Sequence, residues 1–268
     1  MIVGLLTLFT QVGGVIYLLC LPLFHVIKKF TSGWKKGFAQ WSCFVVIYSL
    51  FTFLIVPPLA KWQSGRVPMP IWNHPNLKPH NFFYYCFLNH HYVRPTLKSA
   101  AENVANVLAK KYPGTVLCYL DANFPFFNGY PLEPHFSHRD GKKLDISLHW
   151  IKSKTGQPMF GNPSFYGYGA CASPLPGEYD TANHCGNDGN WFRRVETIGA
   201  ELFYNTNNFE LDAERTREMI RLFAEQKTVG KILLEPHLKT RLNLTQYGKI
   251  RFQGCKAARH DDHIHVQL

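Results

Sequence analysis

Acidic residues are scarce in this chain of 268 residues, which has 18 Asp and Glu against 29 Lys and Arg. The formal net charge of +11 at pH 7 favours anionic partners such as acidic lipid, a cell-wall polymer or nucleic acid. There is no dense run of Lys and Arg interleaved with aromatics, and two long uncharged stretches indicate a membrane protein, so no nucleic acid partner is expected. A lipid surface or a wall polymer is the better interpretation, and the oligomeric state stays open.

Paired cysteine motifs are missing as well. The seven cysteines include no CxxC pair, which excludes the common structural zinc sites built on such pairs. Cys20 and Cys43 lie in apolar segments and are expected to be packing residues. If the rest of the chain lies outside the cytoplasm, disulfides are plausible, and Cys171 with Cys185 would close a short loop rich in Gly and Pro. The pairing stays open among Cys86, Cys118, Cys171, Cys185 and Cys255.

Charge is absent from two long N-terminal stretches. Residues 2–27 contain no Asp, Glu, Lys or Arg, and neither do residues 37–60. Each stretch is long enough to cross a hydrocarbon core of about 30 Å. A secretory signal peptide is the competing interpretation of the first stretch, but it lacks a basic n-region and a small-x-small cleavage site. We therefore predict two transmembrane helices within residues 1–60.

Four lysines lie in the short segment 28–36 between these stretches. Positive charge in a short loop marks the cytoplasmic side of a membrane, so both termini are expected outside. Alternatively, these lysines at the ends of the two helices only extend their charged groups to the membrane–water interface. In that case the charge does not indicate a side, and the topology stays open. The first interpretation predicts a protein of the cell inner membrane whose residues 61–268 form a domain facing the periplasm or exterior.

The residues after 60 have the patterns of an α+β domain, in which helices flank an antiparallel sheet, and no internal repeat is present. Helical apolar spacing predicts helices at 96–111, 191–204 and 212–226. Alternating or β-branched runs predict strands at 115–120, 143–150, 229–234 and 263–268. Residues 153–190 are rich in Gly, Pro, Asn and Tyr and are expected to form a long loop that shapes a cleft.

Two of the predicted strands combine an apolar face with a face of metal-binding side chains. In the last strand, His263 and His265 are two residues apart and share one face, while the apolar residues between and after them take the other. In the strand around Asp145, the carboxylate and His149 likewise share a face opposite apolar residues. Each strand can therefore pack against a core and still present ligands.

Two imidazoles, one carboxylate and a water form a tetrahedral zinc site with an open position. Zinc in such a site lowers the pKa of the water towards about 7 and polarises a carbonyl, although other transition metals accept the same ligands. A nearby imidazole can then take a proton or stabilise an oxyanion. His263 and His260 are spare imidazoles close to His265 in the sequence.

Coincidence must be weighed, because the chain has 13 histidines and a lone HxH usually has no metal. His149 is a candidate neighbour of the ligands because of its strand face. Five histidines outside the two segments are expected to be surface or loop residues: His74, His80, His90, His91 and His135. The two segments together are far more specific than either one.

The spacing His138-x6-Asp145, followed by His260-x2-His263-x-His265, resembles the zinc peptidases grouped with lysostaphin, the D-Ala-D-Ala peptidases and the hedgehog domains. It is most similar to the penicillin-insensitive murein endopeptidases, and the likeness covers about residues 85–268. The matching residues are Ser137-His138, Gly141, Asp145-Ile146, His260, Asp262-His263 and His265-Val266.

The resemblance implies that His138, Asp145 and His265 hold a Zn2+ ion. It also implies that His263 is the catalytic imidazole and that His260 is a second active-site imidazole. Family members cleave amide bonds in peptidoglycan cross-links, so the implied function is a zinc-dependent, murein endopeptidase-like metallopeptidase acting on peptidoglycan or its peptides. They are typically soluble periplasmic proteins, and the long central loop does not align here. The cleaved bond, and endopeptidase against carboxypeptidase activity, therefore stay open.

Two other functions are compatible with the same residues. A hedgehog-like module would use the zinc structurally and recognise cell wall or a protein partner without cleaving it. His263 and His260 argue against this, because a structural site is closed and needs no poised base. A peptidase acting on proteins or a small dipeptide has the same site chemistry, since a site does not name its substrate.

Overall fold

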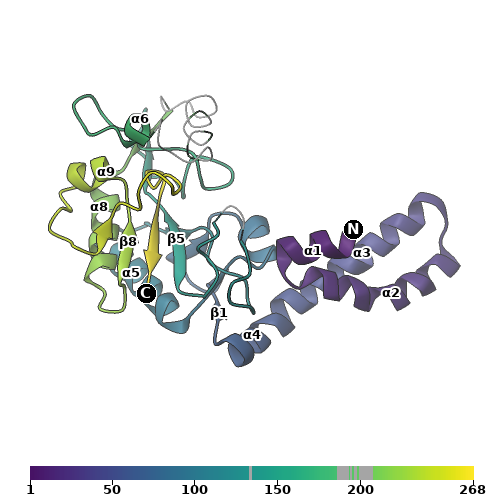
Figure 1. The fold of residues 1–268 in the computed structure, drawn as a ribbon. Coiled ribbons are helices and arrows are strands. Elements are labelled where there is room, and N and C mark those ends of the chain that lie inside the picture. The colour runs from purple at the N-terminus through teal and green to yellow at the C-terminus, as the bar shows by residue number, and fades with distance from the viewer. Residues whose placement is uncertain (133–134, 186–192, 194, 196–197, 199–207) are drawn as a thin grey trace.

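The fold is mixed α+β, with apolar N-terminal helices extending away from a domain that contains the sheet (Figure 1). The computed structural model describes residues 1–132, 135–185, 193, 195, 198 and 208–268. The predicted helix at 191–204 therefore falls almost entirely outside the described residues.

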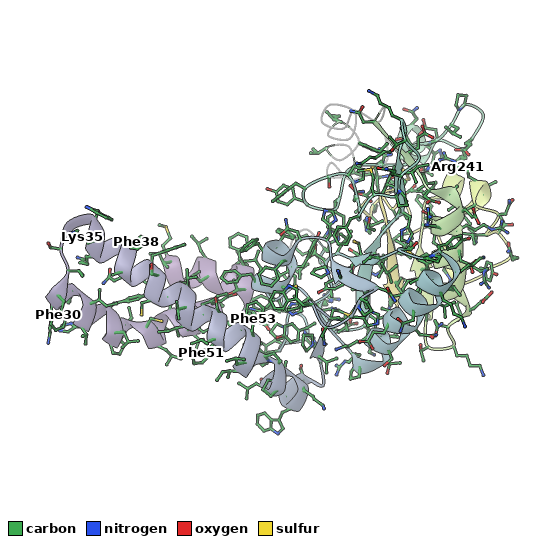
Figure 2. All side chains as sticks on the ribbon, turned by 180° about the vertical axis from the view of Figure 1, so that it is seen from behind. Phe30, Lys35, Phe38, Phe51, Phe53 and Arg241 are labelled. Atoms are coloured by element: carbon green, nitrogen blue, oxygen red, sulfur yellow. A yellow bond between two sulfur atoms is a disulfide. The ribbon has the colours of Figure 1, made fainter. Side chains whose placement is uncertain are left out.

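Two helices are long and apolar enough to cross a membrane, Gly13–Phe30 and Gly33–Ser64. The first is α2, and the second joins α3 (Gly33–Leu50), a π-helical turn (Phe51–Ile55) and α4 (Val56–Ser64). The two long helices form a hairpin. Figure 2 shows Phe30 and Lys35 near its tip, with Phe51 and Phe53 closer to the domain. Many large apolar side chains of both helices face outward, which suits lipid better than water.

The first uncharged stretch forms two helices, whereas the sequence predicted one. Helix α1 (Ile2–Thr10) ends where Gln11 takes a φ of 64°, and α2 begins at Gly13. Thr10 Oγ1 accepts a 2.7 Å hydrogen bond from Gly13 N and stabilises the turn. Gln11 Oε1 accepts from Phe126 N at 2.8 Å, so the end of α1 rests on the domain. Hydropathy alone could not detect this break, because the apolar composition continues across it.

A six-stranded sheet in the order β2-β4-β5-β10-β8-β9 forms the centre of the domain. The antiparallel pairs β4–β5, β5–β10 and β10–β8 lie in its middle, and β2–β4 and β8–β9 are parallel. The prediction of an antiparallel sheet is therefore right for the centre and wrong at both edges. The strands are β2 (Leu77–Pro79), β4 (Leu117–Tyr119), β5 (Lys143–Ser147), β8 (Lys231–Leu233), β9 (Ile250–Arg251) and β10 (His263–Gln267).

One face of the sheet packs against two helices, α5 (Pro95–Lys111) and α8 (Ala213–Glu225). The alternate apolar residues of β5 and β10 lie in this core, as their periodicity predicted: Leu144, Ile146, Ile264 and Val266. Both helices were predicted within one residue of their ends. Asp212 caps α8, since its Oδ1 accepts from Arg215 N at 3.1 Å. The remaining short elements are β1 (Val67–Pro68), β3 (Tyr92–Val93), a π-helical turn (Phe82–Phe87), α6 (Thr181–Cys185) and α9 (Pro236–Arg241).

The predicted strand at 143–150 is divided between two sheets. After β5 ends, β6 (Trp150–Lys152) pairs with β7 (Phe209–Leu211) in a separate two-stranded sheet. The backbone turns between them because His149 O accepts from Asp212 N at 2.9 Å. The sequence predicted one continuous strand here, because the alternation of residues does not show that the chain moves from one sheet to another.

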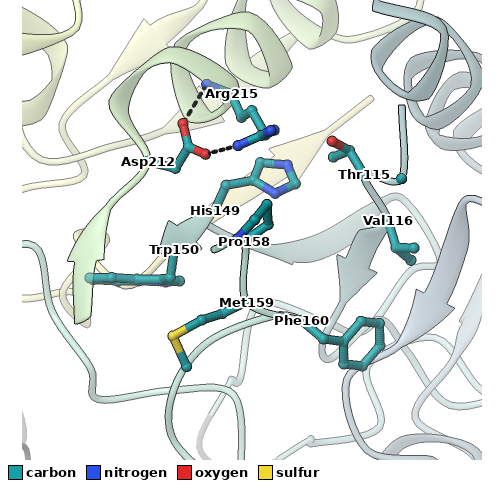
Figure 3. A pocket seen from close by; sticks show the side chains of 10 residues that line it. Thr115, Val116, His149, Trp150, Pro158, Met159, Phe160, Asp212 and Arg215 are labelled. Atoms are coloured by element: carbon teal, nitrogen blue, oxygen red, sulfur yellow. Dashed lines mark hydrogen bonds and ion pairs between the residues drawn. The ribbon is translucent and has the colours of Figure 1, made fainter. Parts of the chain in front are cut away.

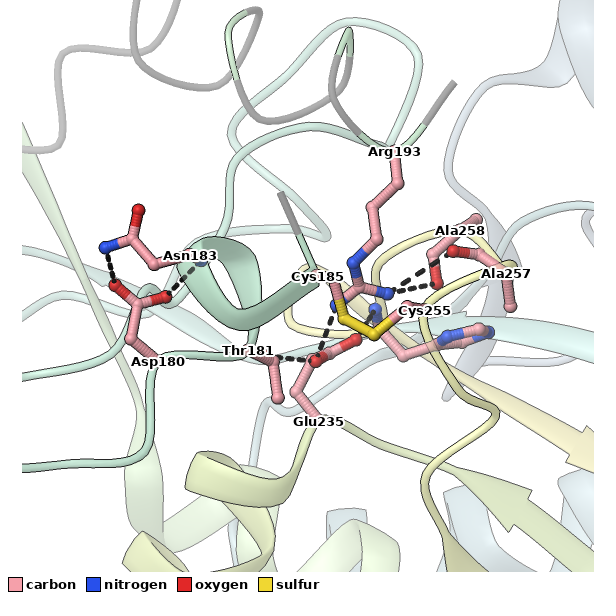
Figure 4. Close-up of a disulfide and its surroundings, with 10 residues drawn as sticks. Asp180, Thr181, Asn183, Cys185, Arg193, Glu235, Cys255, Ala257 and Ala258 are labelled. Carbon is pink, nitrogen blue, oxygen red and sulfur yellow. Dashed lines mark hydrogen bonds and ion pairs between the residues drawn. A yellow bond between two sulfur atoms is a disulfide. The ribbon is translucent and has the colours of Figure 1, made fainter. Parts of the chain in front are cut away.

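The disulfide joins Cys185 to Cys255, not Cys171 to Cys185 as the loop composition suggested. Cys171 is a free, buried cysteine. Figure 4 shows the disulfide beside Glu235, whose Oε2 accepts from Thr181 Oγ1 and from Arg193 Nη2 at 2.8 Å. The bond therefore ties α6 to the segment that leads into His260.

Candidate metal centre

The candidate metal centre lies on two adjacent antiparallel strands, β5 and β10. Asp145 lies directly opposite His265, and Ser147 lies opposite His263. Opposed residues of a strand pair point to the same face of the sheet, so Asp145, His263 and His265 share one face. Their exposed fractions are 0%, 2% and 4%, so these polar side chains are almost entirely enclosed.

His138 reaches the same point from the loop between β4 and β5. Its Nε2 lies 3.0 Å from His265 Nδ1 and 3.2 Å from Asp145 Oδ1. Asp145 Oδ1 lies 2.9 Å from His265 Nδ1. The structure therefore brings together one atom from each of the residues that the sequence predicted as ligands.

The chemistry and spacing of these atoms fit a metal ion. Zinc–ligand bonds of about 2.0–2.2 Å place tetrahedral ligands roughly 3.3–3.6 Å apart, only slightly wider than this triangle. His138 Nδ1 lies 2.6 Å from Ala122 O. A carbonyl only accepts, so Nδ1 carries the proton and Nε2 presents its lone pair to the centre.

Electrostatics at the centre favour a bound cation. Burial opposes ionisation of Asp145, but His138, His263 and His265 hold its pKa well below the ordinary range. Burial lowers the pKa of His265 to about 4, which leaves its imidazole neutral at neutral pH. Burial also acts to lower the pKa of His138, but Asp145 outweighs this effect and raises it. The ionised carboxylate of Asp145 and the neutral imidazole of His265 are in the protonation states that metal binding requires, and a metal at the centre would compete with the proton that Asp145 favours on His138.

His135 also belongs to this centre, although the sequence suggested a surface or loop residue. His135, His138 and Asp145 form a largely buried group, with ligand atoms all within 4.8 Å, that could hold a metal ion. His135 Nδ1 lies 3.4 Å from Asp145 Oδ2. Its spacing three residues before His138 was the signal in the sequence that could have identified it.

Two further histidines lie in a loop, as the sequence predicted, but are buried and not at the surface. His90 and His91 are 4% and 1% exposed. His90 Nδ1 lies 3.0 Å from Asp121 Oδ1, and His90 Nε2 lies 3.2 Å from Phe9 O in helix α1. His74 and His80 are half-buried loop residues, in line with the prediction.

The two imidazoles predicted to be catalytic lie beside the ligands. His263 Nε2 is 3.8 Å from Asp145 Oδ2, and its Nδ1 pairs with Asp262 Oδ1. The ring of His260 lies 5.0 Å from that of His263 and 6.1 Å from that of His265. Burial, reinforced by His263 and His265, holds the pKa of His260 well below its ordinary value. Both imidazoles therefore lie beside the predicted ligand atoms.

The long loop contributes a side chain that the sequence did not single out. The hydroxyl of Tyr168 lies 3.0 Å from Asp145 Oδ2 and 3.1 Å from Asp121 Oδ2. Its ring is stacked on His135, with centroids 4.7 Å apart. Nothing in the sequence distinguishes Tyr168 among 13 tyrosines. The loop therefore reaches the metal centre through Tyr168.

A buried arginine holds the loop that carries His135 and His138. Arg66 donates to Phe124 O, and its Nη2 lies 3.2 Å from Arg139 O. Gly141 packs against it with a φ of 78°, and a Cβ there would lie 3.0 Å from Arg66 Nε. The backbone conformation therefore favours a glycine at this position, and any larger residue would also crowd Arg66.

His149 does not join the centre, contrary to the prediction from strand alternation. Strand β5 ends at Ser147, and the backbone N of His149 donates to Thr216 Oγ1 at 3.1 Å. The residue thus turns towards α8, because the alternation of faces applies only while the strand continues.

Comparison with known proteins does not extend this description. No protein-family model matches the chain, and no curated protein sequence matches it significantly. The likeness to murein endopeptidases therefore stays a prediction that rests on the two motifs.

Proposed function

We propose that this protein is a membrane-anchored zinc metallopeptidase that cleaves amide bonds in peptidoglycan peptides. The observation that carries the proposal is the convergence of His138 Nε2, Asp145 Oδ1 and His265 Nδ1 within 3.2 Å of one another. The presence of His263 beside them favours catalysis over a purely structural site, which would need no further imidazole.

In this mechanism His138, Asp145 and His265 would hold the ion. Bound zinc would supply Lewis acidity to the amide carbonyl and would acidify an attacking water molecule. His263 Nε2, which faces the Asp145 carboxylate, would accept a proton from the attacking water and return it to the leaving amine, as a general base and then a general acid. Asp262 fixes the orientation of His263 through the Asp262 Oδ1–His263 Nδ1 contact and keeps Nε2 directed at the centre.

Two further side chains have roles in this mechanism. His260 stays neutral because of its low pKa, and it donates a hydrogen bond to negative charge developing on the carbonyl oxygen. Tyr168 holds the second carboxylate oxygen of Asp145, which leaves Oδ1 for the metal. His135, whose ring is stacked on Tyr168, supports the same carboxylate oxygen, or binds the ion as a further ligand.

The proposed location is the inner membrane, with the domain facing the periplasm or exterior. Two apolar helices of sufficient length support a membrane anchor. Lys28, Lys29, Lys35 and Lys36 at the hairpin tip support a cytoplasmic loop. The net charge of +11 agrees with an anionic wall polymer as partner.

A zinc-binding module without catalysis is the second candidate function. It is favoured by the near-complete burial of His263 and His265, which leaves little exposed surface at the ligands themselves. Such a module would recognise wall or a protein partner and would not depend on His263 for its activity.

The test is digestion of purified peptidoglycan by the full chain in detergent, with and without a chelator, read by mass spectrometry of the released muropeptides. We expect chelator-sensitive loss of cross-linked dimers that added zinc restores. His263→Ala should abolish cleavage while zinc stays bound, and His184→Ala, which changes an exposed histidine, should cleave normally. A folded, zinc-loaded protein that cleaves nothing would contradict the proposal and support the binding module.

A further inference from the structure

A separate cavity of about 230 Å³ lies where the turn before β4 meets the start of β6 and the N-terminus of α8 (Figure 3). Its walls come from residues 114–116, 149–150 and 158–160 and from Asp212 and Arg215 of α8. None of these residues belongs to the metal centre. Pockets for drug-sized ligands span roughly 300–1,000 Å³, so this cavity suits a smaller molecule.

Several buried polar atoms around the cavity have no hydrogen-bond partner within the described part of the chain. They are Thr115 Oγ1, His149 Nε2, Trp150 Nε1 and Arg215 Nε. Thr115 and His149 are only 6% and 8% exposed. Buried polar groups in folded proteins are nearly always paired, so four unpaired groups around one cavity indicate a missing polar ligand.

The position of Arg215 suits a ligand with a negative group. Asp212 Oδ2 accepts from Arg215 Nη1, and this contact fixes one end of the guanidinium. The guanidinium also lies over the ring of Tyr112, with Cζ 5.4 Å from the ring centroid. The edge of the guanidinium that carries Nε is available to pair with a planar acceptor. A carboxylate fits this edge, because its two oxygens can accept two parallel N–H bonds from a guanidinium.

The neighbours of Arg215 complete a polar end of the cavity. Figure 3 shows the ring of His149 between Arg215 and Pro158, with the Thr115 hydroxyl on the same side as Arg215. Burial lowers the pKa of His149 to about 4, so its imidazole is neutral at neutral pH and Nε2 can donate. Hydroxyl, imidazole and guanidinium can therefore all donate to one acceptor group.

The other end of the cavity is apolar. Val116, Pro158, Met159 and Phe160 line it and offer no charged group. A ligand that fills the cavity therefore combines a compact acceptor head with an apolar body. The Asp212–Arg215 pair leaves no net charge in the walls, so recognition depends on the directed donors rather than on a general positive field.

We propose that this cavity is a binding site for a small carboxylic acid with an apolar body. The carboxylate pairs with Arg215, Thr115 and His149, and the body rests against Val116, Met159 and Phe160. The site is independent of the metal centre and of the function proposed for it.

The proposal is tested by ligand-observed fluorine NMR on the full chain in detergent micelles. The probes are para-fluorophenylacetate, its fluorinated cyclohexyl and isobutyl analogues, and para-fluorophenylacetamide as the neutral match. We expect at least one acid to bind and the amide to bind at least about tenfold more weakly, because it lacks the charged acceptor. Empty micelles measure partition into detergent.

Three variants locate the binding. Met159→Trp should fill the cavity and abolish binding, and Thr115→Val should weaken it about tenfold by removing one hydrogen bond without changing side-chain size. Arg221→Gln, on the same helix but outside the cavity, should bind like the parent. The proposal is overturned if no acid binds, if the amide binds as well as the acid, or if a folded Met159→Trp protein binds unchanged.

Discussion

Asp145 is the side chain on which the contacts of the metal centre converge. Four imidazoles lie within 3.8 Å of its carboxylate: those of His135, His138, His263 and His265. One buried carboxylate cannot be balanced by neutral rings, so a bound cation removes the cost of keeping it ionised. His138 and His265 contact Oδ1 of Asp145, whereas His135 and His263 contact Oδ2, and the proposed ligands are the two imidazoles on Oδ1.

The third ligand of the ion can be identified by comparing two alanine variants. His265 Nδ1 contacts the same Asp145 oxygen as His138, whereas His135 contacts the other oxygen. We therefore expect His265→Ala to weaken zinc binding by at least about 100-fold and His135→Ala by about tenfold, the range of a supporting group. Competition with a chromophoric chelator measures both affinities.

Asp140→Asn is the matched control, because Asp140 pairs with Lys143 at 2.8 Å and has no contact with Asp145 among the described interactions. It should bind zinc like the parent. The assignment of His265 would be contradicted if His135→Ala lost the metal and His265→Ala kept it.

The sequence predicted those residues of the site whose positions depend on the alternation of side chains along a strand. A period of two predicted the shared face of His263 and His265, and the apolar alternate residues predicted which face packs inward. His135 and Tyr168 were missed because their approach depends on two loops, one held by the buried Arg66 and one pairing with Asp262 through Gly169. Loop positions of this kind arise from contacts between distant segments, which a single sequence does not reveal.

Among the elements, α8 is joined to α5 by a charged group at its centre. Glu218 accepts from Arg221 Nη2 at 2.8 Å, and Lys111 Nζ of α5 lies 3.2 Å from the same carboxylate. The hydrogen bond from Arg221 is the main reason that the pKa of Glu218 falls from 4.5 to about 2. A pKa below the unfolded value means that the pair stabilises the fold above pH 4.5.

Glu218→Gln should therefore lower the free energy of unfolding at pH 7 by about 1 kcal/mol, a modest value because its partners are partly exposed. The difference from the parent should shrink as the pH falls from 4.5 towards 2, where the parent carboxylate is protonated as well. Denaturant unfolding of parent and variant at several pH values measures this difference in the free energy of unfolding. Glu214→Gln on the same helix is the control, and a difference that does not depend on pH would contradict the assignment.

The disulfide stabilises the segment before β10. Cys185 and Cys255 are separated by 70 residues, so the bond closes a long loop in the unfolded chain. Cys255→Ser should lower the free energy of unfolding by about 2–4 kcal/mol. A reductant should shift the thermal unfolding of the parent and leave that of the variant unchanged. Equal stability of parent and variant without reductant would show that the bond contributes little.

Helices and strands with a regular spacing of apolar residues were predictable from the sequence. The points at which the chain breaks a helix or leaves one sheet for another were not. The helices α5 and α8 follow from their apolar spacing, and the start of α8 also follows from its capping residue, Asp212. The division of the run at 143–150 depends on α8, whose Asp212 and Thr216 bond the backbone of His149. The break at Gln11 depends on the domain surface under α1. In both cases the deciding contact comes from a distant part of the chain.

In the whole molecule, the N-terminal helices and the metal centre are connected. Ser64, at the end of α4, donates to Pro125 O at 2.6 Å, and Tyr130 donates to Thr7 O of α1 at 2.6 Å. The loop between β4 and β5 is thus held from both sides by the apolar helices. An anchor that only tethered the domain would not need these contacts.

A chain of polar contacts extends from α1 to Asp145 and gives the last prediction. Phe9 O pairs with His90, His90 with Asp121 at 3.0 Å, Asp121 with Tyr168 at 3.1 Å, and Tyr168 with Asp145 at 3.0 Å. Deleting residues 2–10 leaves both long helices intact but frees His90, so zinc affinity should fall about tenfold, as it does for supporting partners of ligands. His90→Phe should reproduce the loss, whereas Tyr130→Phe, which removes a different contact with α1, should not. Unchanged affinity in the deletion, measured by chelator competition, would mean that α1 serves the membrane alone.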